Sequence, residues 1–231
     1  MSFWHAQSAD LSLLFGPMPA QRLLLDSHLP AVANLLAHAM VDDPAYAYLM
    51  PDLATRHRGL ADYFARSLRT YVPHRCTYLA LDDNVACGTV TVRPPGGIHI
   101  STLTMIRRGL LPFAREHGVG AVRRLFALKD VYDGIEARLS QGQPHWYVHM
   151  MAVDPSKQGH GMGSALLASA LAATADARGT APLPVLLTTH NERNVAFYCR
   201  TGFEVIHEQD VSLDGAAPYR VWGMRRARRS D

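Results

Sequence analysis

The sequence predicts an α/β (α+β) protein in which helices flank a central mixed sheet of about seven strands. Three observations predict this fold class. Strand-like and helix-like segments alternate along the chain, and a strand–loop–helix–strand crossover occupies residues 146–189. With 48% hydrophobic and 19% charged residues in a chain of 231, the composition is that of an ordinary globular protein with a well-buried core.

The chain contains no internal repeat and no low-complexity segment, so we expect one domain over residues 1–231. Within it we expect an N-terminal extension at 1–20, a helical insertion at 94–145 and a basic tail at 226–231. The N-terminus lacks a basic region followed by an apolar core and a small-residue cleavage site, so we expect no signal peptide.

The N-terminal half begins with a short apolar strand at Arg22–Asp26. Pro30–Met40 carries leucine, valine and alanine at helical spacing, and Pro44 ends this helix because proline disfavours helical geometry in the residue before it. Thr55–Tyr71 is predicted to be a second helix, since its large apolar residues recur at every fourth position.

Two strands follow, at Thr77–Leu81 and Val85–Val92, joined by a turn at 82–84 whose Asp-Asp-Asn sequence is typical of a hairpin. Thr102–Ser140 is mostly helical in its pattern. The two glycines of 118–120 are expected to divide this segment into two helices.

The C-terminal half contains the crossover. A strand at Trp146–Val153 leads through a glycine-rich loop into a helix at Ser164–Arg178, and Val185–Thr189 is a second apolar strand. A short helix at Asn191–Arg200 ends at Gly202, since glycine commonly terminates helices. Two further strands close the chain: Phe203–Ser212 and Arg220–Arg225.

Charge and composition exclude several function classes. The net charge is +3, and much of this excess comes from the tail arginines, so nothing indicates a nucleic-acid partner. No stretch approaches the roughly 18 apolar residues of a membrane span, so we expect no membrane partner. Cys76, Cys87 and Cys199 form no C-x-x-C pair, which argues against a disulfide framework or a metal site and favours a reducing cytoplasm.

Residues 153–163, Val-Asp-Pro-Ser-Lys-Gln-Gly-His-Gly-Met-Gly, are the most informative segment. Gly159, Gly161 and Gly163 stand at alternate positions between a strand and a helix, and glycine lets a backbone close around a ligand. Free backbone N–H groups at a helix N-terminus bind phosphate oxygens. The sequence therefore predicts a diphosphate-binding loop here.

Three kinds of phosphate-binding loop could use such a run of glycines. A P-loop requires a Gly-Lys-Ser/Thr ending, whereas this chain has Gly163-Ser164-Ala165. The dinucleotide fingerprint requires G-x-G-x-x-G and an acidic residue after the next strand, whereas this loop has G-x-G-x-G and the next strand ends in Thr188-Thr189. The third pattern is that of an acyl-CoA-binding loop.

Gln158-x-x-Gly161-x-Gly163, preceded by Val153-x-Pro155, resembles the acyl-CoA signature of the GCN5-related N-acetyltransferase (GNAT) superfamily. A second signature of that family is matched by Asn191-Glu-Arg-Asn-Val-Ala-Phe-Tyr-Cys-Arg-Thr-Gly-Phe203. The resemblance is clearest over residues 145–210. The second signature and the long helical insertion look most like the branch of the puromycin N-acetyltransferases.

The resemblance implies a GNAT fold, with a mostly antiparallel, twisted sheet that splays open between strands 146–153 and 185–189. Acetyl-CoA would lie in that gap as co-substrate, its pantetheine arm against the first strand and its diphosphate on the glycine loop. The residues implied to contact it are Met151, Ala152, Val153, Gln158, Gly159, His160, Gly161, Met162, Gly163, Ser164, Asn191, Asn194 and Tyr198. Asn191 is open to a second interpretation, as the N-cap of its helix.

Acetyl transfer from a thioester to an amine requires a proton donor for the thiolate and a neutral amine. We interpret Tyr198 as the general acid, because a phenol with a pKa of about 10 matches a thiolate leaving group. His149 is our candidate general base. It stands two residues before Met151, so a regular strand would place both on one face, and His149-Met-Met-Ala-Val resembles a strand of the serotonin N-acetyltransferases. His190, Glu192, Asp42 and Asp43 compete for this role.

The acceptor is expected to contact residues 40–52, the 94–140 region and the 210–220 loop. Asp42, Asp43 and Tyr46 would suit a small cationic, partly aromatic amine. The same residues also fit a capped helix end with packing tyrosines, and that alternative stays open.

The sequence therefore predicts an acyltransferase that acetylates the primary amine of a small molecule by direct attack in a ternary complex. We expect a monomer or a homodimer. Acetylation of a protein N-terminus or lysine is the alternative within the enzyme class. From another class, a non-catalytic acyl-CoA-binding sensor would use the same loop without transfer.

Overall fold

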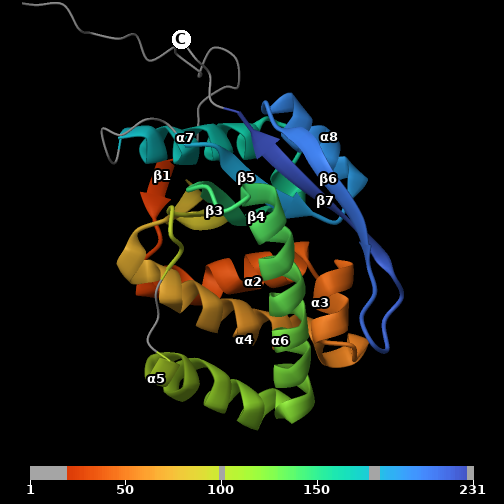
Figure 1. Cartoon of the computed structure of the whole chain (residues 1–231). Coiled ribbons are helices and arrows are strands. Elements are labelled where there is room, and N and C mark those ends of the chain that lie inside the picture. The colour runs from red at the N-terminus through yellow and green to blue at the C-terminus, as the bar shows by residue number, and fades with distance from the viewer. Residues whose placement is uncertain (1–19, 99–101, 177–182, 228–231) are drawn as a thin grey trace, which may run out of the picture.

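The computed structural model describes residues 20–98, 102–176 and 183–227 (Figure 1). Within these ranges seven strands form one sheet in the order β1-β2-β3-β4-β5-β7-β6. The strands are β1 (Ala20–Leu23), β2 (Thr77–Asp82), β3 (Val85–Arg93), β4 (Trp146–Val153), β5 (Val185–Thr189), β6 (Glu204–Val211) and β7 (Tyr219–Arg226).

All neighbouring strands pair antiparallel except β4 and β5, which run parallel. The predicted fold class, a mixed and mostly antiparallel sheet flanked by helices, is therefore confirmed. The predicted turn between β2 and β3 is also present. Asp83 and Asn84 both have positive φ, 47° and 64°, which is the geometry of a two-residue hairpin turn.

Helices cover both faces of the sheet (Figure 1). One face packs against α7 and α8, and the other packs against α2, α4 and α6, so two separate apolar clusters form. The helices are α2 (Leu29–Ala39), α3 (Pro44–Leu49), α4 (Leu53–Tyr71), α5 (Thr102–Thr104), α6 (Leu111–Ser140), α7 (Met162–Asp176) and α8 (Glu192–Arg200).

Three details of the helices differ from or refine the sequence prediction. The short helix α3 was not predicted; Pro44 opens it and Asp43 caps it, its Oδ1 accepting a hydrogen bond from the backbone N–H of Ala45 at 3.0 Å. The predicted break at 118–120 is present, since Gly118 has φ 79° and ψ 163° within α6. Met105–Leu110, before α6, is a π-helix.

Helix α6 lies directly on the sheet and also contacts α3. A Cβ at Gly223 of β7 would overlap the side chain of Leu139, so the absence of a side chain there lets α6 approach the strand closely. The predicted insertion is thus an integral layer that covers one face of the sheet (Figure 1).

Strand β4 contains a β-bulge at His149. The register with β3 pairs Val92 with Val148 and Thr91 with Met150, which leaves His149 without a partner. The extra residue interrupts the alternation of side chains along β4. Tyr147 and Met150 therefore face the α2–α4–α6 side of the sheet, and Val148 and Met151 face the other side. The prediction that His149 and Met151 share a face is therefore wrong.

Some sequence predictions lie outside the described residues: nearly all of the extension at 1–20, the end of the helix predicted to reach Arg178, and most of the basic tail at 226–231. Within the described part of the chain, no helix combines the length and apolar character that crossing a bilayer requires.

Candidate active site

The site is organised by the parting of β4 and β5. Their parallel pairing covers only Trp146–Val148 on β4 and Val185–Leu187 on β5. Beyond Val148 the edge of β4 that faces β5 has no strand partner, so backbone polar groups there are left for another molecule. The predicted splay between these two strands is present.

The loop after β4 is held in shape by its own side chains. The Asp154 carboxylate accepts hydrogen bonds from the backbone N–H and the hydroxyl of Ser156, at 2.9 and 2.6 Å. Lys157 Nζ lies 2.6 Å from Asp82 Oδ2, which ties the loop to the β2–β3 hairpin. Gln158 Nε2 donates to the carbonyl oxygen of Val153 at 2.9 Å. The loop is therefore braced on both sides.

Two of the three glycines in this loop adopt the backbone conformation that favours glycine. Gly159 has φ 83° and Gly161 has φ 79°, in the region that favours glycine. Gly163 has helical geometry, and a Cβ there would lie 3.4 Å from both Met151 Cε and Phe197. The three glycines thus serve two purposes: two permit the turn, and the third permits close packing of α7 against the strand.

The start of α7 presents free donors. Within the described residues, the backbone N–H groups of 159–164 have no acceptor. The first backbone hydrogen bond of the helix is donated by the N–H of Ala165 to the carbonyl oxygen of Gly161, at 3.0 Å. Six N–H groups in a loop that opens a helix form a concave site for an anion. The geometry fits the diphosphate site that the sequence predicted.

Tyr198 lies on α8 beside this loop and on the same side of the sheet as Met151. Its hydroxyl lies 3.9 Å from Met151 Sδ, and its ring packs against Phe197 and Phe203. Burial raises the pKa of the Tyr198 hydroxyl well above its ordinary value, with a smaller contribution from Tyr147. The phenol is therefore neutral and carries a proton.

The two asparagines of the second signature have different surroundings. Asn191 is the N-cap of α8, its side-chain oxygen accepting from the backbone N–H of Arg193 at 2.9 Å. Asn194 is exposed, as is Glu192. The capping interpretation of Asn191 therefore applies, and a ligand contact by either asparagine stays a prediction.

His149 faces the other side of the sheet, where its ring lies 5.5 Å from the ring of Tyr71 and 6.5 Å from that of Tyr147. Its imidazole has no hydrogen-bond partner in the part of the chain that the structure describes. Burial, with the charge of Arg93, lowers the pKa of His149 to about 3. The ring is therefore neutral and binds a proton only weakly, which makes His149 a poor general base.

A hydrogen-bonded chain runs across this second side of the sheet. His190 Nδ1 lies 2.8 Å from Asp43 Oδ2, and His190 Nε2 lies 2.8 Å from the hydroxyl of Tyr132. The Tyr132 hydroxyl in turn lies 2.9 Å from that of Tyr219. We call these four residues the Asp43–Tyr219 chain. It joins the turn before α3, the end of β5, α6 and the start of β7.

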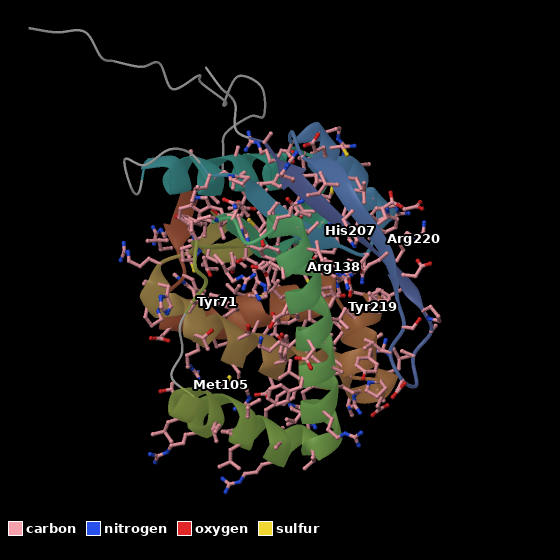
Figure 2. All side chains as sticks on the ribbon, in the orientation of Figure 1. Tyr71, Met105, Arg138, His207, Tyr219 and Arg220 are labelled. Carbon is pink, nitrogen blue, oxygen red and sulfur yellow. The ribbon has the colours of Figure 1, made fainter. Side chains whose placement is uncertain are left out.

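Tyrosine dominates this side of the sheet. Seven of the nine tyrosines belong to the apolar cluster there: Tyr46, Tyr48, Tyr63, Tyr71, Tyr132, Tyr147 and Tyr219. In Figure 2, Tyr71 and Tyr219 lie on either side of α6. Burial raises the pKa of Tyr46, and nearby Tyr63, Asp43, Tyr71 and Tyr147 raise it further.

Of the predicted acceptor residues, the structure brings Asp43 and Tyr46 together, while Asp42 is exposed. Sequence reasoning missed Tyr132 and Tyr219. One signal for Tyr132 was available, because it stands on a helical stripe with residues that are buried in α6: Leu128, Ile135 and Leu139. Nothing in the sequence indicated that its partner would be His190, directly after β5.

A half-buried ionic cluster lies on the same side of the sheet. Arg93 pairs with Glu136, and its guanidinium carbon lies 4.5 Å from the centre of the Tyr147 ring. His145 Nε2 lies 3.2 Å from the second oxygen of Glu136. With the loop after β3, these residues line a cavity of about 200 Å³. The cluster was not predicted.

The sequence model of the family described as "Acetyltransferase (GNAT) domain" matches residues 73–205, which is more than half of the chain. The chain belongs to this family. The matched segment contains β4, the glycine loop, β5 and α8, so the acetyltransferase signatures and the parting strands coincide. The predicted membership of the GNAT superfamily is confirmed, as is the prediction of an acyltransferase.

Solved structures of acetyltransferases share the fold. A protein of Corynebacterium glutamicum described as "histone acetyltransferase HPA2 and related acetyltransferase" is 19% identical, with a TM-score of 0.59 over 93% of this chain and 100% of that one. A polyamine N-acetyltransferase of Drosophila melanogaster is 15% identical, with a TM-score of 0.57 over 89% and 98%. A phosphinothricin acetyltransferase of Sinorhizobium meliloti, solved with AcCoA, is 12% identical, with a TM-score of 0.53 over 91% and 88%.

The ionic cluster gives this acetyltransferase a predictable pH dependence of stability. The hydrogen bond to Glu136 raises the pKa of His145 despite burial. Burial alone would raise the pKa of Glu136, but His145 and Arg93 hold it below its ordinary value. A histidine with a raised folded-state pKa stabilises the fold below its unfolded pKa, and this contribution disappears as pH rises through the folded value.

We therefore expect His145→Gln to lower the free energy of unfolding more at about pH 5.5 than at about pH 8. Urea denaturation at the two pH values measures the difference. The exposed His74→Gln is the matched control and should show no such pH dependence. Equal losses at both pH values for His145→Gln would contradict the assignment.

Proposed function

We propose that the protein transfers the acetyl group of acetyl-CoA to the primary amine of a small molecule, by direct attack in a ternary complex. The observation that carries this proposal is the gap between β4 and β5, which has a glycine loop with free N–H groups on one side of the sheet and a tyrosine-rich cluster with Asp43 on the other. Acetyl-CoA supplies the acetyl group as an activated thioester.

On the first side, the free N–H groups of 159–164 would hold the diphosphate, and the unpaired edge of β4 at Met151, Ala152 and Val153 would hold the pantetheine arm as an added strand would. A β4 backbone N–H at this edge would polarise the thioester carbonyl. The residues that we propose for this role are those implied by the sequence: Met151, Ala152, Val153, Gln158, Gly159, His160, Gly161, Met162, Gly163, Ser164, Asn191, Asn194 and Tyr198.

Tyr198 would give the departing thiolate its proton. The hydroxyl lies on the side of β4 that carries Met151, next to the glycine loop, and its raised pKa keeps it protonated until a strong base forms beside it. A thiolate formed in the same buried surroundings would be such a base, because burial raises the pKa of a thiol as it raises that of a phenol.

The acceptor would bind on the second side, among the tyrosines and Asp43. Aromatic faces and a carboxylate together recognise a cationic amine. Among solved structures of this fold are an agmatine N-acetyltransferase and a polyamine N-acetyltransferase, whose named substrates are small cationic amines. Helix α6 covers this face, which supports a small molecule over a protein chain as acceptor.

Cellular location and assembly remain predictions of this proposal. The three thiols Cys76, Cys87 and Cys199 are all free, which supports the cytoplasm. No three histidine, cysteine or acidic side chains cluster as metal ligands within the described ranges. A monomer or a homodimer is expected.

A panel of small amines with acetyl-CoA, followed by release of free thiol, tests the function. We expect turnover with cationic amines that carry an aromatic or alkyl body, and no turnover with acetyl-CoA alone. Tight CoA binding without turnover of any amine would instead favour the acyl-CoA sensor. Turnover confined to peptides would favour a protein acetyltransferase.

Replacing Tyr198 by Phe tests the proton donor. We expect kcat to fall by about 10²–10⁴, as is typical when a general acid is removed, while the affinity for CoA changes much less because phenylalanine keeps the ring. Tyr78→Phe, on β2 away from the gap, is the matched control and should keep its activity. Unchanged turnover in Tyr198→Phe would rule out the role.

Replacing Gly161 by Val tests the loop. A branched residue at positive φ costs about 1–3 kcal/mol of stability, and its side chain also enters the proposed diphosphate site. We expect CoA affinity, measured by calorimetry, to fall about tenfold or more. Gly142→Val carries a similar backbone penalty, at φ 75°, outside the loop and should keep its CoA affinity. Equal affinities in the two variants would contradict the loop assignment.

A further inference from the structure

The Asp43–Tyr219 chain lies on the side of the sheet opposite Tyr198 and the glycine loop, and its geometry points to a second catalytic function. We propose that His190 is the final acceptor of the proton that the amine loses, that Asp43 positions His190, and that Tyr219 and Tyr132 pass the proton to it. This inference rests on the proposed function, because it concerns the acceptor side of the same reaction.

Hydrogen-bond geometry fixes the direction in which a proton can move. The Asp43 carboxylate can only accept, so His190 Nδ1–H donates to it at 2.8 Å. The remaining nitrogen, Nε2, is then the acceptor for the Tyr132 hydroxyl, also at 2.8 Å. Tyr132 accepts in turn from Tyr219 at 2.9 Å, which leaves the Tyr219 oxygen with a free lone pair.

The position of the Asp43–Tyr219 chain suits an amine that enters the gap. His190 directly follows β5, beyond the point where β5 leaves β4. The Tyr147 hydroxyl on β4 lies 2.8 Å from Thr188 Oγ1, so the β4 wall and the β5 wall are joined just before His190. The proton acceptor would therefore stand on the β5 wall of the gap, opposite the β4 edge proposed for the thioester.

Charge and burial also distinguish His190 from His149. The groups that face His190 are Asp43 from the turn before α3, Tyr132 from α6 and Tyr219 from β7. Only Asp43 is charged, and its Oδ2 lies 2.8 Å from His190 Nδ1. His149 has no carboxylate partner, and Arg93 disfavours its protonated form.

The step balances without any co-reactant. One N–H bond of the ammonium breaks as its proton passes to Tyr219 Oη, the Tyr219 proton moves to Tyr132 Oη, and the Tyr132 proton forms a bond to His190 Nε2. The amine nitrogen is left with a lone pair. The proton that this nitrogen later loses as the amide forms balances the one that the thiolate takes from Tyr198, so the proton on His190 is released to solvent.

The test measures kcat/KM against pH with an amine that wild type acetylates. We expect wild-type activity to fall on the acid side as His190 becomes protonated. His190→Gln should lower kcat/KM about 10²-fold and remove this acid limb. Asp43→Asn keeps an N-cap for α3, because asparagine caps as well as aspartate does, but it should displace the acid limb. Tyr219→Phe should lower kcat more than it raises KM.

Asp62 and His117 provide a matched control. They form a comparable pair on α4 and α6, with 2.9 Å between His117 Nε2 and Asp62 Oδ2. His117→Gln should keep the wild-type pH profile. A wild-type profile in both His190→Gln and Asp43→Asn would overturn the inference, as would loss of the acid limb in His149→Gln alone.

The two proposals fail in different ways. If wild type acetylates no amine, the proposed function fails. If wild type is active and the His190 and Asp43 variants keep its pH profile, only this inference fails. Thermal unfolding and CoA binding of each variant show whether it is folded, and the Asp43→Asn profile decides the question if His190→Gln does not fold.

Discussion

The structure depends on one incomplete interaction, the parallel pairing of β4 with β5. Three residues of each strand pair, and then the strands part. A full ladder would fill the middle of the sheet with protein hydrogen bonds, whereas the partial one leaves strand edges that face each other across an open space. Antiparallel pairs on both outer sides hold the two strands in place, so the gap is built into a rigid sheet.

The gap separates two chemically different environments. Tyr198 and the glycine loop lie with the α7–α8 layer, and the Asp43–Tyr219 chain lies with the α2–α4–α6 layer. A reaction that needs one proton donor and one proton acceptor benefits from this separation, because the two groups cannot neutralise each other directly. The β-bulge at His149 contributes to it, since it turns Met151 towards the first layer and Met150 towards the second.

Local patterns predicted most of the fold. The bounds of β4 and β5 match the apolar runs, and the Asp-Asp-Asn turn forms where expected, because these features depend on a few neighbouring residues. The glycine loop was predictable for the same reason. The bulge was not, since His149-Met-Met-Ala offers no alternation of polar and apolar residues whose reversal could be seen.

Contacts between residues far apart in the sequence could not be predicted either. Tyr132 and His190 stand 58 positions apart, and Asp43 and His190 stand 147 apart, so only the packing of α3 and α6 on the sheet brings them together. Each residue alone looked like an ordinary member of its segment. The candidate base could therefore be narrowed to a few residues but not selected among them.

Asp43 uses its two carboxylate oxygens for different purposes: one caps α3 and the other holds His190. The first turn of a six-residue helix and the orientation of an imidazole on another part of the sheet are thereby tied to a single side chain. A molecule that loosened this turn would also release the imidazole, and one that tightened it would fix the ring. A change in the local folding of the segment between α2 and α4 would thus change the reactivity of the His190 imidazole.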